Sequence, residues 1–176
     1  MSKINQERKF IPLNIAVLTI SDTRTEESDI SGKRLVEMLE GCQHLLFEKK
    51  IVPDDIEIIR QYVAKWISDE KVDVILTTGG TGITGRDGTP EAIAPLLDKV
   101  IDGFGEIFRA ISYQKIKSSS LQSRAIAGVA NGKFLFCLPG SVNACITAWE
   151  ELIKVQLDFR TRPCNLVELI PRLKEK

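Results

Sequence analysis

The stretch that decides the fold is Val72-Asp-Val-Ile-Leu-Thr-Thr-Gly-Gly-Thr-Gly82. It begins with a short apolar run rich in β-branched side chains, which is typical of a strand buried on both faces of a parallel sheet. Three glycines then follow in four positions, and they allow a tight turn whose backbone N–H groups face a phosphate. The segment predicts a strand that runs into an anion-binding loop, although an ordinary tight turn fits the glycines alone about equally well.

Apolar runs and helical spacings alternate along the rest of the chain. Three more strands are predicted, at residues 14–20, 45–52 and 134–138. Helical spacing of apolar residues predicts helices at residues 35–42, 56–67, 100–113 and 144–153. A further helix is predicted to begin at Thr89-Pro90-Glu91, with the threonine as N-cap, whereas residues 118–121 predict a loop. This alternation predicts one α/β domain over residues 1–176, with a mostly parallel central sheet that helices cover on both faces.

The composition limits the function classes. Lys+Arg is 24 and Asp+Glu is 24, so a net charge of +0 gives no basic surface for nucleic acid or an anionic membrane. One histidine and four cysteines without CxxC spacing argue against a zinc site and predict reduced, mostly buried thiols in a cytoplasmic protein. Residues 1–10 lack the apolar core of a signal peptide, and no apolar stretch is long enough to span a bilayer. An anionic ligand must therefore be held by local donors or by a metal.

Three polar loops leave the carboxyl ends of predicted strands. They are Ser21-Asp22, Gly79–Gly82 and Pro139-Gly140-Ser141. Because ligands bind beyond these ends in parallel sheets, we expect the three loops to converge on one site. Ser141 is expected to cap its helix, and the N-terminus of that helix can also receive a phosphate.

Other candidate residues accompany these loops. Asp87 is expected to bind Mg²⁺ beside the glycines, with a local turn role as the alternative. Asp54 follows a proline at a helix start, where a helix cap is as compatible with the pattern as a functional carboxylate. Ser123 and Arg124 offer a hydroxyl and a planar donor to an anion, or are ordinary surface residues. His44 is predicted to be structural or exposed.

Several motifs occur together in a fixed order over about residues 12–155. They are ISDTR at 20–24, DISG at 29–32, TTGGTG at 77–82, RD at 86–87, TPEA at 89–92, GFGE at 103–106, FR at 108–109, LQSR at 121–124 and LPGS at 138–141. In order and spacing they resemble the MoaB/MogA/gephyrin-G-domain family of molybdenum cofactor biosynthesis proteins. Residues 144–145 and 161–164 look more like the MoaB branch than the MogA branch.

The resemblance implies a three-layer α/β/α fold, a molybdopterin-binding site, and homotrimers or homohexamers. Active members adenylylate molybdopterin with Mg-ATP and release pyrophosphate. The family's two essential aspartates correspond to Asp54 and Asp87, which are therefore expected to be catalytic and to hold Mg²⁺. Substrate and nucleotide contacts are expected from Ser21, Asp22, Gly79, Gly80, Thr81, Gly82, Thr89, Glu91, Ser123, Arg124, Pro139, Gly140 and Ser141. Mg²⁺ and ATP enter as co-substrates, no tightly bound cofactor is expected, and other molybdenum cofactor biosynthesis proteins are candidate partners.

Two other functions also fit the sequence. The chain is then either a paralogue that binds molybdopterin or the finished cofactor without catalysis, or a generic nucleotide- or sugar-phosphate-binding protein. Pterin binding without ATP turnover is expected of the first, and nucleotide binding that ignores the pterin is expected of the second.

Overall fold

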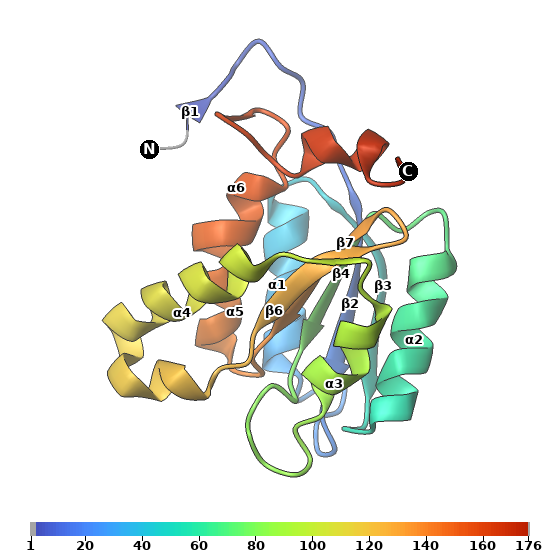
Figure 1. Cartoon of the computed structure of the whole chain (residues 1–176), viewed down its shortest axis with the longest axis vertical. Helices are drawn as coiled ribbons and strands as arrows, with labels where there is room; N and C mark the ends of the chain where they lie inside the picture. The colour runs from blue at the N-terminus through green and yellow to red at the C-terminus, as the bar shows by residue number, and fades with distance from the viewer. Residues whose placement is uncertain (1–2, 176) are drawn as a thin grey trace.

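The computed structural model describes residues 3–175, and its centre is a six-stranded sheet of order β3-β2-β4-β7-β6-β5 (Figure 1). The strands are β2 Asn14–Ile20, β3 Leu45–Val52, β4 Val74–Thr78, β5 Lys99–Val100, β6 Ile126–Ala130 and β7 Lys133–Leu138. The strands β3, β2, β4 and β7 pair in parallel, whereas β6 and β5 extend the sheet in antiparallel pairing. The predicted α/β fold with a mostly parallel sheet is confirmed.

Helices cover both faces of this sheet (Figure 1). On one face lie α1 (Ile30–Gly41), α4 (Asp102–Ile116) and α5 (Val142–Ala148), and on the other lie α2 (Ile56–Ser68) and α3 (Thr89–Ile93). Alternate residues of β2 enter separate cores, because successive strand side chains point to opposite faces. Ile15 and Val17 pack with the first group of helices, and Ala16 and Leu18 pack with the second. The molecule is therefore built of three layers.

The remaining elements extend the helices or close the end of the molecule where the chain termini lie. The short helices are η1 (Ala94–Leu96), η2 (Lys117–Gln122), the π-helical η3 (Trp149–Ile153), α6 (Lys154–Gln156) and η4 (Val167–Arg172). A separate antiparallel pair joins β1 (Lys3–Ile4) to β8 (Thr161–Arg162). Both termini lie at the end opposite the loop that follows β4 (Figure 1). Among the helices of residues 3–175, none combines the length and apolar character that crossing a membrane requires.

Several local predictions are wrong. Residues 118–121 belong to the 3₁₀ helix η2 and are not a loop, and the helix expected from residue 100 begins at Asp102 after the short strand β5. The strand β6 was not predicted, because its sequence Ile-Ala-Gly-Val-Ala lacks a long apolar run. The two residues that join it to β7, Asn131 and Gly132, both have positive φ, as a tight two-residue hairpin turn requires.

The four cysteines are free thiols in different environments. Cys137 and Cys145 are buried, Cys42 is half-buried and Cys164 is exposed. Burial raises the pKa of Cys137 to about 12 and that of Cys145 to about 11, so both remain protonated at neutral pH. These two buried thiols act as small apolar core residues.

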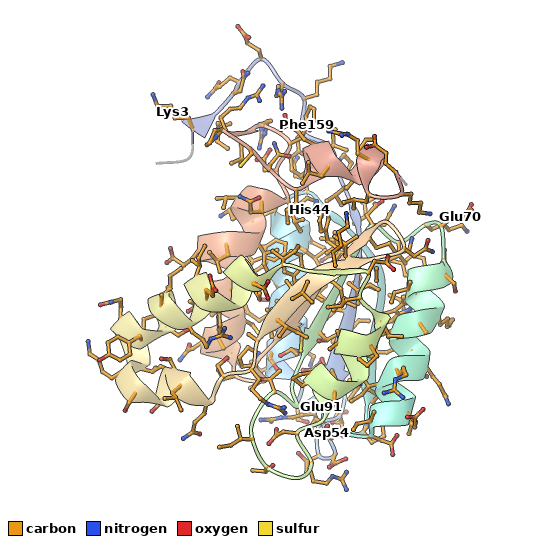
Figure 2. All side chains as sticks on the ribbon, in the orientation of Figure 1. Lys3, His44, Asp54, Glu70, Glu91 and Phe159 are labelled. Carbon is orange, nitrogen blue, oxygen red and sulfur yellow. The ribbon has the colours of Figure 1, made fainter. Side chains whose placement is uncertain are left out.

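His44 is a structural residue inside the core, and it makes the stability dependent on pH (Figure 2). It is 3% exposed, its Nδ1 accepts the N–H of Leu13, and its ring meets Phe10 and Trp149. Burial lowers its pKa to about 4, partly opposed by the charge of Asp158.

We therefore expect the free energy of unfolding to fall as the pH drops from about 6.5 toward about 4, since in this window the unfolded chain binds a proton that the folded chain refuses. Urea titrations at pH 7 and pH 5 measure this loss. His44→Asn keeps an acceptor for Leu13 and should flatten the dependence. An equal pH dependence in both proteins would show that His44 is not its source.

Candidate active site

A cavity of about 780 Å³ opens at the carboxyl ends of β2, β4 and β7. The loops after these strands form its floor, and α4, η2 and the start of α5 form its walls. The predicted site residues that line it are Ser21, Gly79–Gly82, Asp87, Ser123 and Pro139–Ser141. The three loops therefore converge, as expected from the strand order. Asp22, Asp54, Thr89, Glu91 and Arg124 lie outside its lining.

The glycines after β4 allow a backbone path that other residues cannot follow. Gly79 and Gly80 have φ of +109° and +63°, which favour glycine. A Cβ on Gly79 would lie 2.1 Å from the carbonyl oxygen of Ile20, and one on Gly80 would lie 2.2 Å from Oγ1 of Thr89. This close packing brings the backbone of the loop against β2 and α3, and leaves its other side open to the cavity.

Thr89 fixes the start of α3 to this loop and does not face the cavity. Its hydroxyl donates to the carbonyl of Gly79 (2.9 Å), and its N–H donates to the carbonyl of Gly80 (3.0 Å). The N-cap position of α3 belongs to Gly88, so the prediction of a Thr89 N-cap is wrong. The threonine side chain holds the loop instead of the helix terminus.

Asp87 is a carboxylate at the edge of the cavity. Its Oδ2 accepts the hydroxyl and the N–H of Thr84 at 2.5 and 2.9 Å. The bond from the Thr84 hydroxyl is the largest cause that lowers the pKa of Asp87, so this group is ionised at neutral pH. Its carboxyl lies directly against Gly82, where a Cβ would approach Oδ2 to 2.6 Å.

Asp54 lies in the turn after β3, at the same end of the molecule as the glycine loop (Figure 2). Both its carboxyl oxygens are 3.0 Å from the position of a Cβ on Gly80. Its Oδ1 is buried and finds no hydrogen-bond partner among residues 3–175. Burial, together with the negative charges of Asp87 and Asp22, raises the pKa of Asp54. Asp55, not Asp54, caps α2 by accepting the N–H of Ile58, so the cap interpretation of Asp54 is wrong.

The two acids lie against Gly80 and Gly82 of one loop, and their pKa values are shifted in opposite directions. Carboxyl groups with shifted pKa values are common at functional sites, where burial and neighbouring like charges tune them for catalysis. Over residues 3–175, no group of three or more His, Cys, Asp and Glu side chains is placed to hold a metal ion.

Asp22 links the turn that contains Asp54 to the segment that contains Asp87. Its Oδ1 accepts the backbone N–H of Asp54 (3.1 Å), and its Oδ2 accepts Arg86 (2.6 Å). It lies in a shallower cleft of about 490 Å³ next to the main cavity, together with Ser21 and Arg24.

Arg124 clamps the glycine loop from outside. Its Nε donates to the carbonyl of Gly82 (2.7 Å), its other nitrogens reach the carbonyl of Asp87 and the carboxylate of Glu91, and its N–H donates to Thr81. These contacts hold Arg124 and Glu91 in positions outside the cavity. The structure thus assigns Arg124 a supporting contact with the loop.

Replacing the guanidinium of Arg124 tests how much its hydrogen bonds contribute to stability. Arg124→Lys keeps the charge but cannot reach both carbonyls and the carboxylate, so we expect the free energy of unfolding to fall by about 1–3 kcal/mol. Urea unfolding measures the change. Arg34→Lys, in an exposed pair with Glu37, is the matched control and should change stability by less than about 0.5 kcal/mol. Equal effects of the two substitutions would rule out the clamp.

The first turn of α1 is held beneath the cavity by a buried ion pair. Asp29 is fully buried, caps α1 through the N–H of Gly32, accepts the hydroxyl of Thr19 and pairs with Lys49 at 2.7 Å. Thr19 and Ser31, which lie beside this network, line the cavity. The motif at residues 29–32 therefore supports the floor of the site without entering it.

Several serine hydroxyl groups lie among the apolar side chains of the walls. The hydroxyl of Ser123 is buried without a partner among residues 3–175, and Ser112 and Ser120 line the same space. Ser141 caps α5 by accepting the N–H of Ala144 (3.2 Å), which agrees with its expected cap. A row of serine side chains, one of them with an unpartnered hydroxyl, suits a ligand with donors and acceptors.

Sequence reasoning missed two cations that line the cavity, Arg24 and Lys115. Lys115 reaches it from α4 and donates to the hydroxyl of Thr147 on α5 (3.0 Å). Lys115 and Thr147 meet only because α4 and α5 cross, which no local sequence pattern indicates. For Arg24, its position directly after the Ser21-Asp22 loop was an available signal.

Comparisons with known proteins agree with this geometry. A family model described as "Probable molybdopterin binding domain" matches residues 16–158. Molybdenum cofactor biosynthesis protein B of Escherichia coli K12 is 50% identical over 165 residues, which cover 94% of this chain and 96% of that protein. A crystal structure of a molybdenum cofactor biosynthesis protein B has a TM-score of 0.86 and 44% identity, covering 96% of this chain and 100% of the other. The tungsten cofactor synthesizing protein MoaB from Pyrococcus furiosus has a TM-score of 0.73 and 39% identity, covering 81% and 91%.

Proposed function

Because the chain belongs to the family of the probable molybdopterin binding domain and has a role in molybdenum cofactor biosynthesis, we propose that it adenylylates molybdopterin with Mg-ATP. We propose that this reaction takes place in the cytoplasm. In the proposed reaction an oxygen of the terminal phosphate of molybdopterin forms a bond to the α-phosphorus of ATP. The bond between the α-phosphorus and the bridging oxygen to the β-phosphorus breaks, and pyrophosphate leaves.

The observation that carries this proposal is the pair of acids, Asp54 and Asp87, whose carboxyl groups lie against Gly80 and Gly82 of the glycine loop. Two polyanions must meet in this reaction, so their charge has to be neutralised where the new bond forms. Mg²⁺ bound to ATP supplies positive charge and orients the phosphates when present. The carboxylates of Asp54 and Asp87 can complete its oxygen shell, and Oδ1 of Asp54 has no hydrogen bond within residues 3–175 to break first.

The chain's other groups bind and orient the substrates. The loop Gly79–Gly82 lines the cavity; the N–H of Gly79 donates to the carbonyl of Leu138 (3.1 Å), so the loop can offer the N–H groups of Gly80 and Thr81 to the phosphate of the pterin. The cavity of about 780 Å³ suits one molecule of pterin size, and Ser112, Ser120 and Ser123 offer hydroxyls to its ring. Lys115 adds positive charge at the wall.

The proposal is tested by pyrophosphate release from ATP with molybdopterin present. We expect release that needs both the pterin and Mg²⁺ and that stops when EDTA is added. Tight pterin binding without release would favour the non-catalytic binding protein instead. Nucleotide binding that ignores the pterin would favour a generic nucleotide-binding protein.

We also propose that the chain assembles as a homotrimer or homohexamer. Large apolar side chains are exposed along α4 and η2, at Ile107, Tyr113, Ile116 and Leu121. Exposed apolar patches of this kind mark interaction surfaces. Light scattering of the purified protein should give a mass three or six times that of one chain, and a monomer at micromolar concentration would contradict the proposal.

A further inference from the structure

Arg86 makes one exposed ion pair next to the two candidate catalytic acids. It lies in the connection between β4 and α3, directly before Asp87, and its guanidinium meets Oδ2 of Asp22 at 2.6 Å. The side chain of Arg86 is 68% exposed and that of Asp22 is 41% exposed. An ion pair this open to water contributes little to stability and is readily exchanged for another anion.

Other cations around the site contact groups of the fold, and Arg24, which lines the cavity, donates to the exposed carbonyl of Ser28 (3.2 Å). Arg124 holds two loop carbonyls and Glu91, and Lys49 pairs with the fully buried Asp29 at 2.7 Å. Lys115 donates to Thr147 across two helices. Arg86 meets Asp22 through a contact in which both side chains are exposed, so it can move without breaking the packing of the site.

The chemistry of the proposed reaction requires such a movable cation. Asp22, Asp54 and Asp87 gather negative charge around the glycine loop, and the charges of Asp87 and Asp22 add to burial in raising the pKa of Asp54. The polyphosphate of ATP adds more negative charge at the same place. A planar guanidinium matches phosphate oxygens in a bidentate way, so Arg86 is suited to receive them.

We propose that Arg86 is a polyphosphate-binding residue, which Asp22 holds beside the site until Mg-ATP arrives and takes its place. This inference rests on the proposed function, because it names the residue that receives the nucleotide in that reaction. Asp22 also accepts the N–H of Asp54 through its other oxygen, so the turn that carries Asp54 stays in position when Arg86 leaves.

A static tether between the two loops is the alternative explanation of this ion pair. The two explanations differ in the sign expected for Asp22→Asn. This substitution keeps an oxygen that can accept the N–H of Asp54 but removes the negative charge that competes with the nucleotide. If Asp22 only holds Arg86 in waiting, its neutralisation frees the arginine for ATP. If the pair is a tether, neutralising either partner loosens the site equally.

The experiment is calorimetric titration of the full chain with Mg-ATP, together with KM and kcat for pyrophosphate release. We expect Arg86→Gln to raise the Kd for Mg-ATP about 10- to 100-fold with unchanged pterin binding. Asp22→Asn should lower this Kd a few-fold or leave it unchanged, and should lower it less in the Arg86→Gln background, where it still removes a repelling charge but frees no arginine. Lys154→Gln, which breaks an exposed pair with Glu150, is the charge-matched control.

Two results would overturn the inference. One is a Kd for Arg86→Gln within twofold of the wild-type value, and the other is an equal weakening by Asp22→Asn and Arg86→Gln. In both cases wild-type turnover would leave the proposed function standing. A wild-type protein that binds no Mg-ATP would overturn the inference and the proposed adenylylation together.

Discussion

Asp54→Asn is expected to lower pyrophosphate release by on the order of 10²- to 10³-fold without lowering the melting temperature. Asparagine has nearly the same shape, so the turn after β3 can keep its path. The substitution removes a charge whose Oδ1 is buried without a partner among residues 3–175 and which Asp87 and Asp22 repel. Because the folded state loses an unfavourable charge, stability should stay equal or rise.

The neighbouring acid provides a matched control with the opposite signature. Asp55 caps α2 by accepting the N–H of Ile58 at 3.0 Å. Asp55→Ala should therefore lower the free energy of unfolding by about 1 kcal/mol and leave most of the turnover intact. Thermal melting and pyrophosphate release, measured on both variants, separate the two roles. Wild-type turnover by Asp54→Asn would show that Asp54 takes no part in catalysis.

Gly79→Ala is expected to damage both the fold and the site. The new Cβ would lie 2.1 Å from the carbonyl oxygen of Ile20, at a φ of +109° that alanine rarely adopts. Backbone strain and the displacement of β2 together predict a loss of about 2–4 kcal/mol in the free energy of unfolding. The loop that faces the cavity must shift with them, so pyrophosphate release should fall as well.

Gly85→Ala is the control for this substitution. It lies in the same connection between β4 and α3, and a Cβ there would meet no other heavy atom of residues 3–175 within 4 Å. Its effect on stability should stay within about 0.5 kcal/mol. If Gly79→Ala unfolds in urea at the same concentration as Gly85→Ala, the close approach of the loop to β2 is not needed.

The parallel half of the sheet could be predicted because its strands are apolar on both faces. The runs in β2, β4 and β7 are short, rich in apolar residues and followed by turn residues, which is typical of buried strands, and their order along the chain places three loops at one edge. The strand β6 was not predicted, because Gly128 and two alanines leave it without a long run of large apolar side chains. Its one clear signal was Asn131-Gly132, which marks the hairpin to β7.

Site residues that directly follow strand ends could be predicted, whereas residues whose position depends on contacts between distant segments could not. The glycines, Asp87 and Ser141 follow strand ends, so their convergence follows from the topology. The pattern Pro53-Asp54-Asp55 did not tell which acid caps α2, because both precede the helix. Arg124 resembled a ligand residue by sequence, but its contacts depend on how the segment before β6 crosses the glycine loop, which no local pattern encodes.

Transfer of label from ATP to the pterin tests the central proposal most directly. The wild-type protein is incubated with molybdopterin, Mg²⁺ and ATP labelled at the α-phosphorus, and the pterin product is isolated. We expect the label in the pterin product together with one pyrophosphate released for each label transferred, and neither in Asp54→Asn. Release of ADP with the label still on the nucleotide, or a pterin that remains unlabelled while bound in the cavity, would contradict adenylylation at this site.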